Sequence, residues 1–197
     1  MKKVIVTDTR IHYEEDPNEI VMDVVSKELM EAYANIVCST KGQTLDVGFG
    51  LGYSATAIYN KVGNVTIIEA NHDIYKRALA WAADKPKAKV YFGDWIKVIP
   101  EMKLRDIKFD GIFMDTYDDD NYTKFEEYAK TIANEGCCLS IYSYFTQRDM
   151  NECHRHYFKL DPYKRANYPK LIEEGHWMHW TYYQNGEFKK KKKDVAI

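Results

Sequence analysis

The sequence of 197 residues lacks the features of membrane, secreted and nucleic-acid-binding proteins. No apolar run approaches the ~20 residues that a membrane-spanning helix needs, and the apolar stretch in residues 1–6 is too short for a signal peptide. Lysine and arginine total 28 against 30 aspartates and glutamates, a net charge of −2 without global bias toward anionic partners. We therefore expect a cytoplasmic protein that binds neither membranes nor specific nucleic acids.

Cysteine is scarce and shows no metal-binding or redox pattern. The four cysteines form no Cys-x-x-Cys pair, and adjacent Cys137 and Cys138 would point to opposite faces of a strand. We expect reduced thiols at all four positions: Cys38, Cys137, Cys138 and Cys153. The histidines at 154, 156, 176 and 179 lack a clear third ligand, and metal sites need three or four converging ligands. No metal site is predicted.

The most informative segment is residues 44–52, Thr-Leu-Asp-Val-Gly-Phe-Gly-Leu-Gly. It is a short apolar strand that runs into three glycines at alternate positions and then into a helix-like segment, 53–61. Glycines permit positive φ and close approach of a ligand, and the first N–H groups of the helix point at whatever is bound. A dinucleotide fingerprint requires Gly-x-Gly-x-x-Gly. Because Gly52 comes one residue early and Tyr53 takes the glycine's place, the pattern disfavours NAD and resembles the first motif of class I S-adenosylmethionine (SAM) dependent methyltransferases.

Two acids follow the glycine turn at the ends of apolar segments. Segment 64–69 is expected to be a buried strand ending in Glu69, where a carboxylate can accept hydrogen bonds from ribose hydroxyls. Segment 89–94 is expected to be a strand ending in Asp94, which in methyltransferases usually contacts adenine. The glycine turn, Glu69 and Asp94 follow one another at the spacing of a SAM site, and together they favour such a site more strongly than the glycine turn alone.

Strands and helices alternate along the first 142 residues. We expect helices over 18–38, 53–61, 72–84, 95–100 and 122–134, and strands over 44–47, 64–69, 88–92, 109–114 and 137–142. The first helix is expected to start at Asp16-Pro17, with Asp as cap and Pro at the first helical position. Such alternation predicts an α/β, Rossmann-like fold, with a mostly parallel sheet covered by helices on both faces. Segments 156–163 and 176–184 are expected to add a C-terminal antiparallel pair.

We expect residues 1–188 to form one methyltransferase domain, in which residues 1–40 supply an N-terminal arm and helix covering the active site. Residues 189–197 begin with five lysines and are expected to be a disordered basic tail. Weak electrostatic attachment of this tail to RNA or anionic surfaces is the alternative.

Four strings together resemble the guanidinoacetate methyltransferase family and its relative, the protein arginine δ-N-methyltransferase. They are Val-Gly-Phe-Gly at 47–50, Ile-Ile-Glu-Ala-Asn-His-Asp at 67–73, Phe-Asp-Gly-Ile at 109–112 and Asp-Thr-Tyr at 115–117. The resemblance spans about residues 8–140. It implies that Asp115 binds the substrate guanidinium and accepts its proton, that Glu69 binds the cofactor ribose, and that Trp95 lies beside the adenine.

The chemistry of Asp115 also makes sense by itself. A guanidinium is fully protonated at neutral pH and has no lone pair to attack a methyl group. A buried carboxylate can orient it by charge-assisted hydrogen bonds and accept a proton as the nitrogen attacks. Asp115 is therefore the expected catalytic base, with Tyr117 as an aromatic wall or hydrogen-bond partner, although Asp115 capping the following loop is the alternative. The expected cofactor-binding residues are Asp46, Gly48, Phe49, Gly50, Gly52, Glu69, Ala70, Asp94, Trp95 and Asp115.

Two positions depart from the family. The family's Trp-Glu-Thr-Pro-Tyr segment carries a second substrate-binding glutamate, and here Ser26 occupies its place, with Glu28 two residues further on. The family's Asn-Leu-Thr after the fifth strand is replaced by Ile-Tyr-Ser-Tyr-Phe at 141–145. The expected function is SAM-dependent N-methylation of a guanidino or amino group, on a small molecule or an arginine side chain. A SAM-binding regulatory subunit, an O-methyltransferase and an aminopropyltransferase are the alternatives, and a homodimer stays open.

Overall fold

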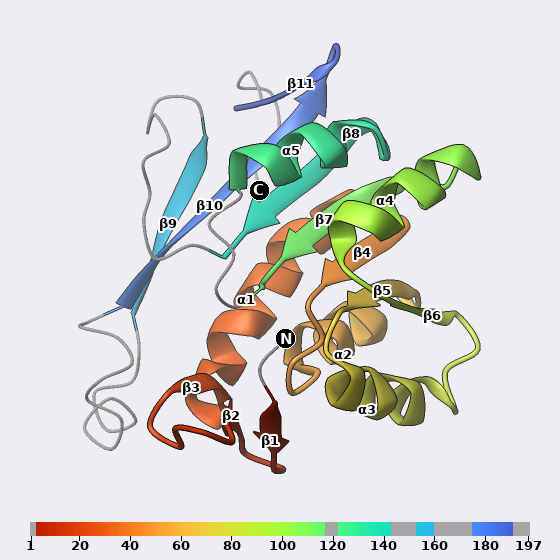
Figure 1. The fold of residues 1–197 in the computed structure, drawn as a ribbon. Helices are drawn as coiled ribbons and strands as arrows, with labels where there is room; N and C mark the ends of the chain where they lie inside the picture. The colour runs from red at the N-terminus through yellow and green to blue at the C-terminus, as the bar shows by residue number, and fades with distance from the viewer. Residues whose placement is uncertain (1–2, 117–121, 143–152, 160–174, 191–197) are drawn as a thin grey trace.

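The computed structural model describes residues 3–116, 122–142, 153–159 and 175–190, and its centre is one mixed sheet (Figure 1). The strand order is β11-β10-β8-β7-β4-β5-β6, with β9 pairing with β10. Strands β6, β5, β4, β7 and β8 run parallel, and β10 runs antiparallel to β8. The strands are β4 (Thr44–Val47), β5 (Val65–Glu69), β6 (Ala88–Phe92), β7 (Phe109–Met114), β8 (Ala133–Ile141), β9 (His154–Lys159), β10 (Gly175–Gln184) and β11 (Glu187–Lys189).

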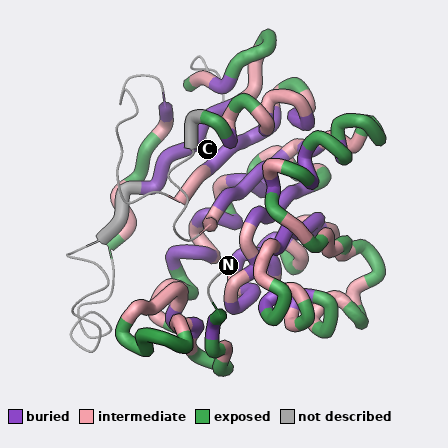
Figure 2. Tube along the Cα trace, in the orientation of Figure 1, coloured by how far each residue is buried: buried purple, intermediate pink, exposed green. Residues whose placement is uncertain are grey.

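Helices cover both faces of this sheet, so its central strands are buried while the outer sides of the helices are exposed (Figure 2). Side chains of successive strand residues point to opposite faces. Ile67 packs in the core cluster that contains residues of α1, α2 and α3, whereas its neighbour Ile68 packs with residues of α4 and α5. The helices are α1 (Lys27–Val37), α2 (Tyr53–Val62), α3 (His72–Ala82), α4 (Trp95–Leu104) and α5 (Tyr122–Lys130). The predicted fold class is confirmed.

The N-terminal segment differs from the prediction. In place of a helix from residue 18, the chain forms a three-stranded antiparallel sheet of β1 (Val4–Val6), β2 (Arg10–Tyr13) and β3 (Ile20–Asp23), and a 3-10 turn, η1 (Val24–Ser26), leads into α1. Asp16 does accept a hydrogen bond from the Asn18 backbone N–H at 2.9 Å, but this closes a turn into β3. The predicted helix start was wrong because an aspartate before proline begins turns as well as helices.

The small sheet lies over the glycine turn, at the carboxyl ends of the parallel strands (Figure 1). The Met22 sulfur accepts a hydrogen bond from the Leu51 N–H at 3.2 Å, and Ile11 is fully buried in the core shared with α1, α2 and α3. Arg10 donates to the buried carboxylate of Asp23 at 2.7 Å, which ties β2 to the end of β3.

The C-terminal strands confirm the predicted antiparallel pair. β9 and β10 pair from Gly175 opposite Lys159 to Trp180 opposite His154. Three bounds were predicted wrongly by four residues. α4 continues through Pro100 to Leu104 rather than ending at 100. α5 ends at Lys130 rather than 134, and β8 begins at Ala133 rather than 137, with a register shift against β7 and a positive φ at Gly136. Of the predicted basic tail, Lys189 ends β11, and residues 191–197 lie outside the described ones.

The four cysteines are buried free thiols, as predicted. Cys137 packs against the α4 and α5 side of the sheet and Cys138 against the opposite side, near Ile36 of α1. Among the described helices, none combines the length and apolar character needed to cross a membrane.

Candidate functional site

The turn between β4 and α2 has a backbone that only glycine fits well. Gly48 has φ +95°, and a Cβ there would collide with the carbonyl oxygen of Asp115. Gly52 has φ +80°, and a Cβ there would press into the Phe49 ring. L-residues rarely adopt such φ values. The turn therefore packs closely against Asp115 and Phe49 at the carboxyl end of the sheet, immediately before the N-terminus of α2.

Glu69 ends β5 beneath this turn and ties two loops together. It is buried, and its carboxylate accepts hydrogen bonds from the Phe49 N–H at 2.9 Å and from the Asn71 N–H at 2.7 Å. Burial raises the pKa of Glu69, while the backbone N–H donors oppose the rise. The backbone N–H groups of Ala70 and Gly50 also act on this carboxylate, so Glu69 is held by both loops.

Asp46 is a second buried carboxylate of this end of the sheet. One oxygen accepts a hydrogen bond from the Ser54 hydroxyl on α2 at 2.8 Å. The other, Oδ1, is buried and has no partner among the described residues. Burial raises the pKa of Asp46 well above its ordinary value, and the charges of Asp115 and Glu69 add to the rise. A buried acceptor without a donor is costly unless a ligand supplies one.

Asp115 directly follows β7 and completes a group of three carboxylates. Its N–H donates to the Val47 carbonyl at 2.9 Å, which continues the pairing of β7 with β4 past the strand end. The residue is half-buried, and desolvation raises the pKa of its carboxyl from 3.8 to about 7. The strands β4, β5 and β7 thus bring Asp46, Glu69 and Asp115 to one edge of the sheet, where they favour a cationic ligand.

Tyr33, which the sequence interpretation missed, lies beside this group. It is fully buried on α1, and its ring stacks on Phe113 of β7 with the ring centroids 4.9 Å apart. It also meets the Tyr142 ring edge-on at 6.0 Å. Its place among Leu29, Met30 and Val37 on the buried face of α1 gave only a core signal, typical of packing residues.

The remaining predicted residues take structural positions. Asp94 is exposed and caps α4 by accepting a hydrogen bond from the Ile96 N–H at 2.9 Å. Trp95 is buried edge-on against Phe125 and Tyr128, and Phe49 packs near Trp81. Ala70 is half-buried just after Glu69. Whether these residues also bind the cofactor stays a prediction.

One predicted site residue and the question of a metal site remain. Tyr117, the predicted aromatic wall or hydrogen-bond partner, lies outside the described ranges. Within those ranges no group of three or more His, Cys, Asp or Glu side chains is arranged to hold a metal ion.

The fold of the chain is that of class I methyltransferases. The chain resembles a putative O-methyltransferase from Klebsiella pneumoniae (TM-score 0.57, 13% identity, 80% of each chain covered). It also resembles the O-methyltransferase from Bacillus cereus, solved in complex with S-adenosylhomocysteine (SAH) (TM-score 0.56, 14% identity, 78% of this chain and 79% of that one). At these identities the likeness shows the fold alone.

The chain belongs to the guanidinoacetate N-methyltransferase family, whose family model matches residues 6–175. Among the curated proteins, protein arginine N-methyltransferase 2 of Yarrowia lipolytica is 27% identical over 137 residues, which cover 65% of this chain but 28% of that protein. The predicted family, class and SAM cofactor are confirmed at the level of the family and its fold.

Proposed function

We propose that this chain is a SAM-dependent N-methyltransferase whose acceptor is a guanidino or amino group. The observation that carries the proposal is Asp115, a desolvated carboxyl with a pKa of about 7 at the carboxyl end of β7. The family's name indicates a guanidino substrate, and the relative from Yarrowia lipolytica is named for protein arginine. Both a small molecule and an arginine side chain therefore belong to the proposal.

The residues of the site fit SAM. The turn at Gly48 and Gly52 leaves no space for side chains, and glycines in such a strand-to-helix turn allow a ligand to approach the backbone closely. The unpartnered Oδ1 of Asp46 suits an ammonium donor such as that of an amino acid, and we assign the carboxylate of Glu69, at the end of β5, to the ribose hydroxyls. When bound, SAM would supply a methyl group already activated on a sulfonium.

Asp115 would orient the acceptor and take its proton. Its carboxylate can accept two N–H bonds from a guanidinium or an ammonium. As the nitrogen would form its bond to the methyl group, the methyl–sulfur bond would break, SAH would leave, and one N–H proton would pass to Asp115. A base whose pKa lies near the working pH is well suited to this task, because it is partly ionised and still holds the proton it receives.

The acceptor site carries fewer charges than the family pattern. Ser26 stands at the end of η1, and Glu28 is exposed in the first turn of α1. Neither supplies a buried carboxylate beside Asp115. An acceptor with one positive charge is therefore favoured. We propose that the site binds the cationic nitrogen of this acceptor and does not require it to carry a carboxylate.

We further propose that residues 1–188 form one domain with the N-terminal segment over the site. The contacts of Met22 with the glycine turn support this placement. The proposed domain leaves residues 189–197 as a basic tail.

Two measurements test the proposal. Calorimetric titration with SAH should show binding that Glu69→Gln weakens at least tenfold, with NAD as the negative control ligand. Methyl transfer is then measured on guanidinoacetate, agmatine, an arginine peptide and simple amines, with wild type and Asp115→Asn. Asp115→Asn should retain SAH binding and lose transfer by roughly 100-fold or more. SAH binding without transfer to any of these acceptors would instead favour a regulatory SAM-binding subunit.

A further inference from the structure

Position 26 lacks the second carboxylate of the family, and Tyr33 lies where another polar group can serve the acceptor. The ring of Tyr33 stacks on Phe113, and α1 packs along β7 and β8. Phe113 and Asp115 are two residues apart, so their side chains lie on the same face of the sheet, with Asp115 nearer its carboxyl end. A group that extends from the Tyr33 ring toward that end approaches Asp115.

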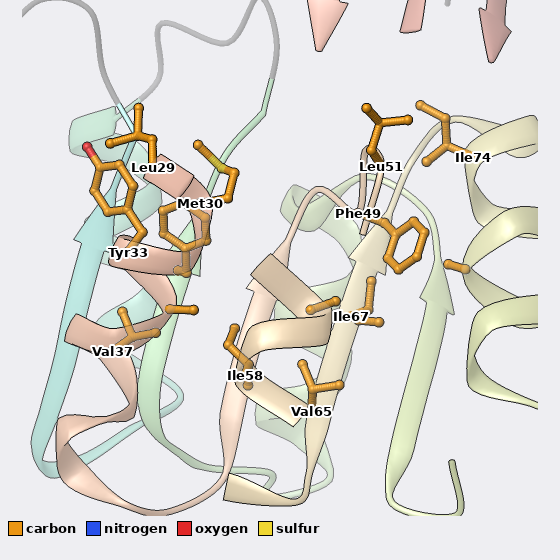
Figure 3. Close-up of a cluster of buried hydrophobic side chains, with 14 of the residues drawn as sticks. Leu29, Met30, Tyr33, Val37, Phe49, Leu51, Ile58, Val65, Ile67 and Ile74 are labelled. Carbon is orange, nitrogen blue, oxygen red and sulfur yellow. The ribbon is translucent and has the colours of Figure 1, made fainter. Parts of the chain in front are cut away.

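The hydroxyl of Tyr33 extends in that direction. Side chains on a helix lean toward the helix N-terminus, and α1 begins at the carboxyl end of the strands. Figure 3 shows the Tyr33 hydroxyl pointing away from Val37 and reaching the level of Leu29, one turn earlier on α1. Electrostatics agrees with this placement, because the charge of Asp115 adds to burial in raising the pKa of Tyr33.

We propose that Tyr33 is the second acceptor-binding residue of the site, a neutral hydroxyl beside Asp115 that serves where the family has a carboxylate. The inference rests on the proposed methyl transfer to a cationic nitrogen. A phenol hydroxyl donates one hydrogen bond and accepts two, so it can donate to Asp115 and accept an N–H from the acceptor. With one carboxylate and one neutral hydroxyl, the site matches the single positive charge of a guanidinium or ammonium.

Tyr142 completes the aromatic side of this subsite. Its N–H donates to the Met114 carbonyl at 2.8 Å, so it lies just past the end of β8, next to the strand that precedes Asp115. Its ring meets Tyr33 edge-on. Cations bind favourably to aromatic faces, and the pair gives the acceptor a polarizable wall.

The test is Tyr33→Phe, which removes the hydroxyl and keeps the stacked ring. The loss of a hydrogen bond to a charged acceptor should raise its KM about 10-fold to 100-fold, while kcat changes by less than about threefold and SAH affinity is unchanged. Tyr59→Phe is the matched control, because Tyr59 is also an aromatic of this core face but packs on Trp81. An unchanged acceptor KM in Tyr33→Phe would overturn the inference.

The pH profile gives a readout that a purely structural role would not move. The charge of Asp115 raises the pKa of Tyr33 from α1 and of Asp46 from β4, and the charge of Glu69 from β5 adds to the rise at Asp46. When the acceptor is bound, a Tyr33 hydroxyl that donates to Asp115 would favour the charged form of its carboxyl. Tyr33→Phe should therefore shift the acidic limb of kcat, which reports the enzyme with its acceptor bound, to higher pH, and Tyr59→Phe should leave it in place.

A binding experiment separates this inference from the proposed activity. The probe is guanidinium chloride titrated into the SAH complex of each variant, without any turnover. If no acceptor is methylated but guanidinium binds about 10-fold more weakly to Tyr33→Phe than to wild type, the inference holds and the activity fails. Equal guanidinium affinity in the two proteins, or no binding to wild type, would refute it.

Discussion

Asp115→Asn should make the protein more stable at alkaline pH while removing its activity. The carboxyl of Asp115 is desolvated at the end of β7, and the pKa in the folded protein is about 7 against an ordinary 3.8. Because the folded state holds this proton more tightly than the unfolded state, stability falls as pH rises from about 4 to about 7. Asparagine has nearly the same shape and carries no charge at any of these pH values.

The size of the effect follows from the two pKa values. Each tenfold change in proton affinity corresponds to about 1.4 kcal/mol, so the ionised Asp115 costs the folded protein roughly 4 kcal/mol at pH 8 as an upper bound. Removal of this charge also removes the repulsion between Asp115 and Asp46, whose pKa the charge of Asp115 helps to raise. The gain from asparagine should therefore be larger at pH 8 than at pH 5, by about 2–3 kcal/mol.

The assay is urea and thermal denaturation of wild type and Asp115→Asn at pH 5 and pH 8. For a domain of this size we expect the difference in Tm to grow by roughly 5–10 °C between the two pH values. Asp106→Asn is the control, since Asp106 is exposed with φ +53°, which asparagine tolerates, and should change little at either pH. A variant no more stable than wild type at pH 8 would refute the desolvation of Asp115.

Two further predictions concern the turn and the N-terminal sheet. Gly48→Ala should weaken SAH binding at least tenfold and lower Tm, because the added Cβ meets the Asp115 carbonyl. Gly63→Ala is the control: Gly63 has φ +74° and open space around it, so the substitution should lower the free energy of unfolding by only about 1–2 kcal/mol. Wild-type SAH affinity in Gly48→Ala would contradict the close approach. Asp23→Asn should cost about 1–3 kcal/mol by weakening the charge-assisted bond from Arg10, with faster hydrogen exchange in β2; unchanged exchange would show that the ion pair does not hold this sheet.

The bounds of strands and helices were predicted correctly where residues adjacent in the sequence determine them. The bounds of β7 were predicted at 109–114 because Phe109 and the apolar run 112–114 mark a buried strand, although Asp110 and Gly111 interrupt it. The α2 helix begins immediately after Gly52, as the glycine turn indicated. The N-terminal sheet was missed because short strands of three or four residues leave little periodicity, and Asp16-Pro17 suited a helix equally well.

The sequence by itself determined the glycine turn, the alternation of strands and helices, and the acids at the end of β5 and just after β7, since each depends on residues adjacent in the chain. Tertiary structure alone decided that Asp46, Glu69 and Asp115 meet at one edge of the sheet, and that Met22 covers the turn. It also decided that Tyr33 stacks on Phe113 beside Asp115. An aromatic residue on the apolar face of a helix has the same local pattern whether it fills a core or borders a site, and only the packing of α1 across β7 separates the two.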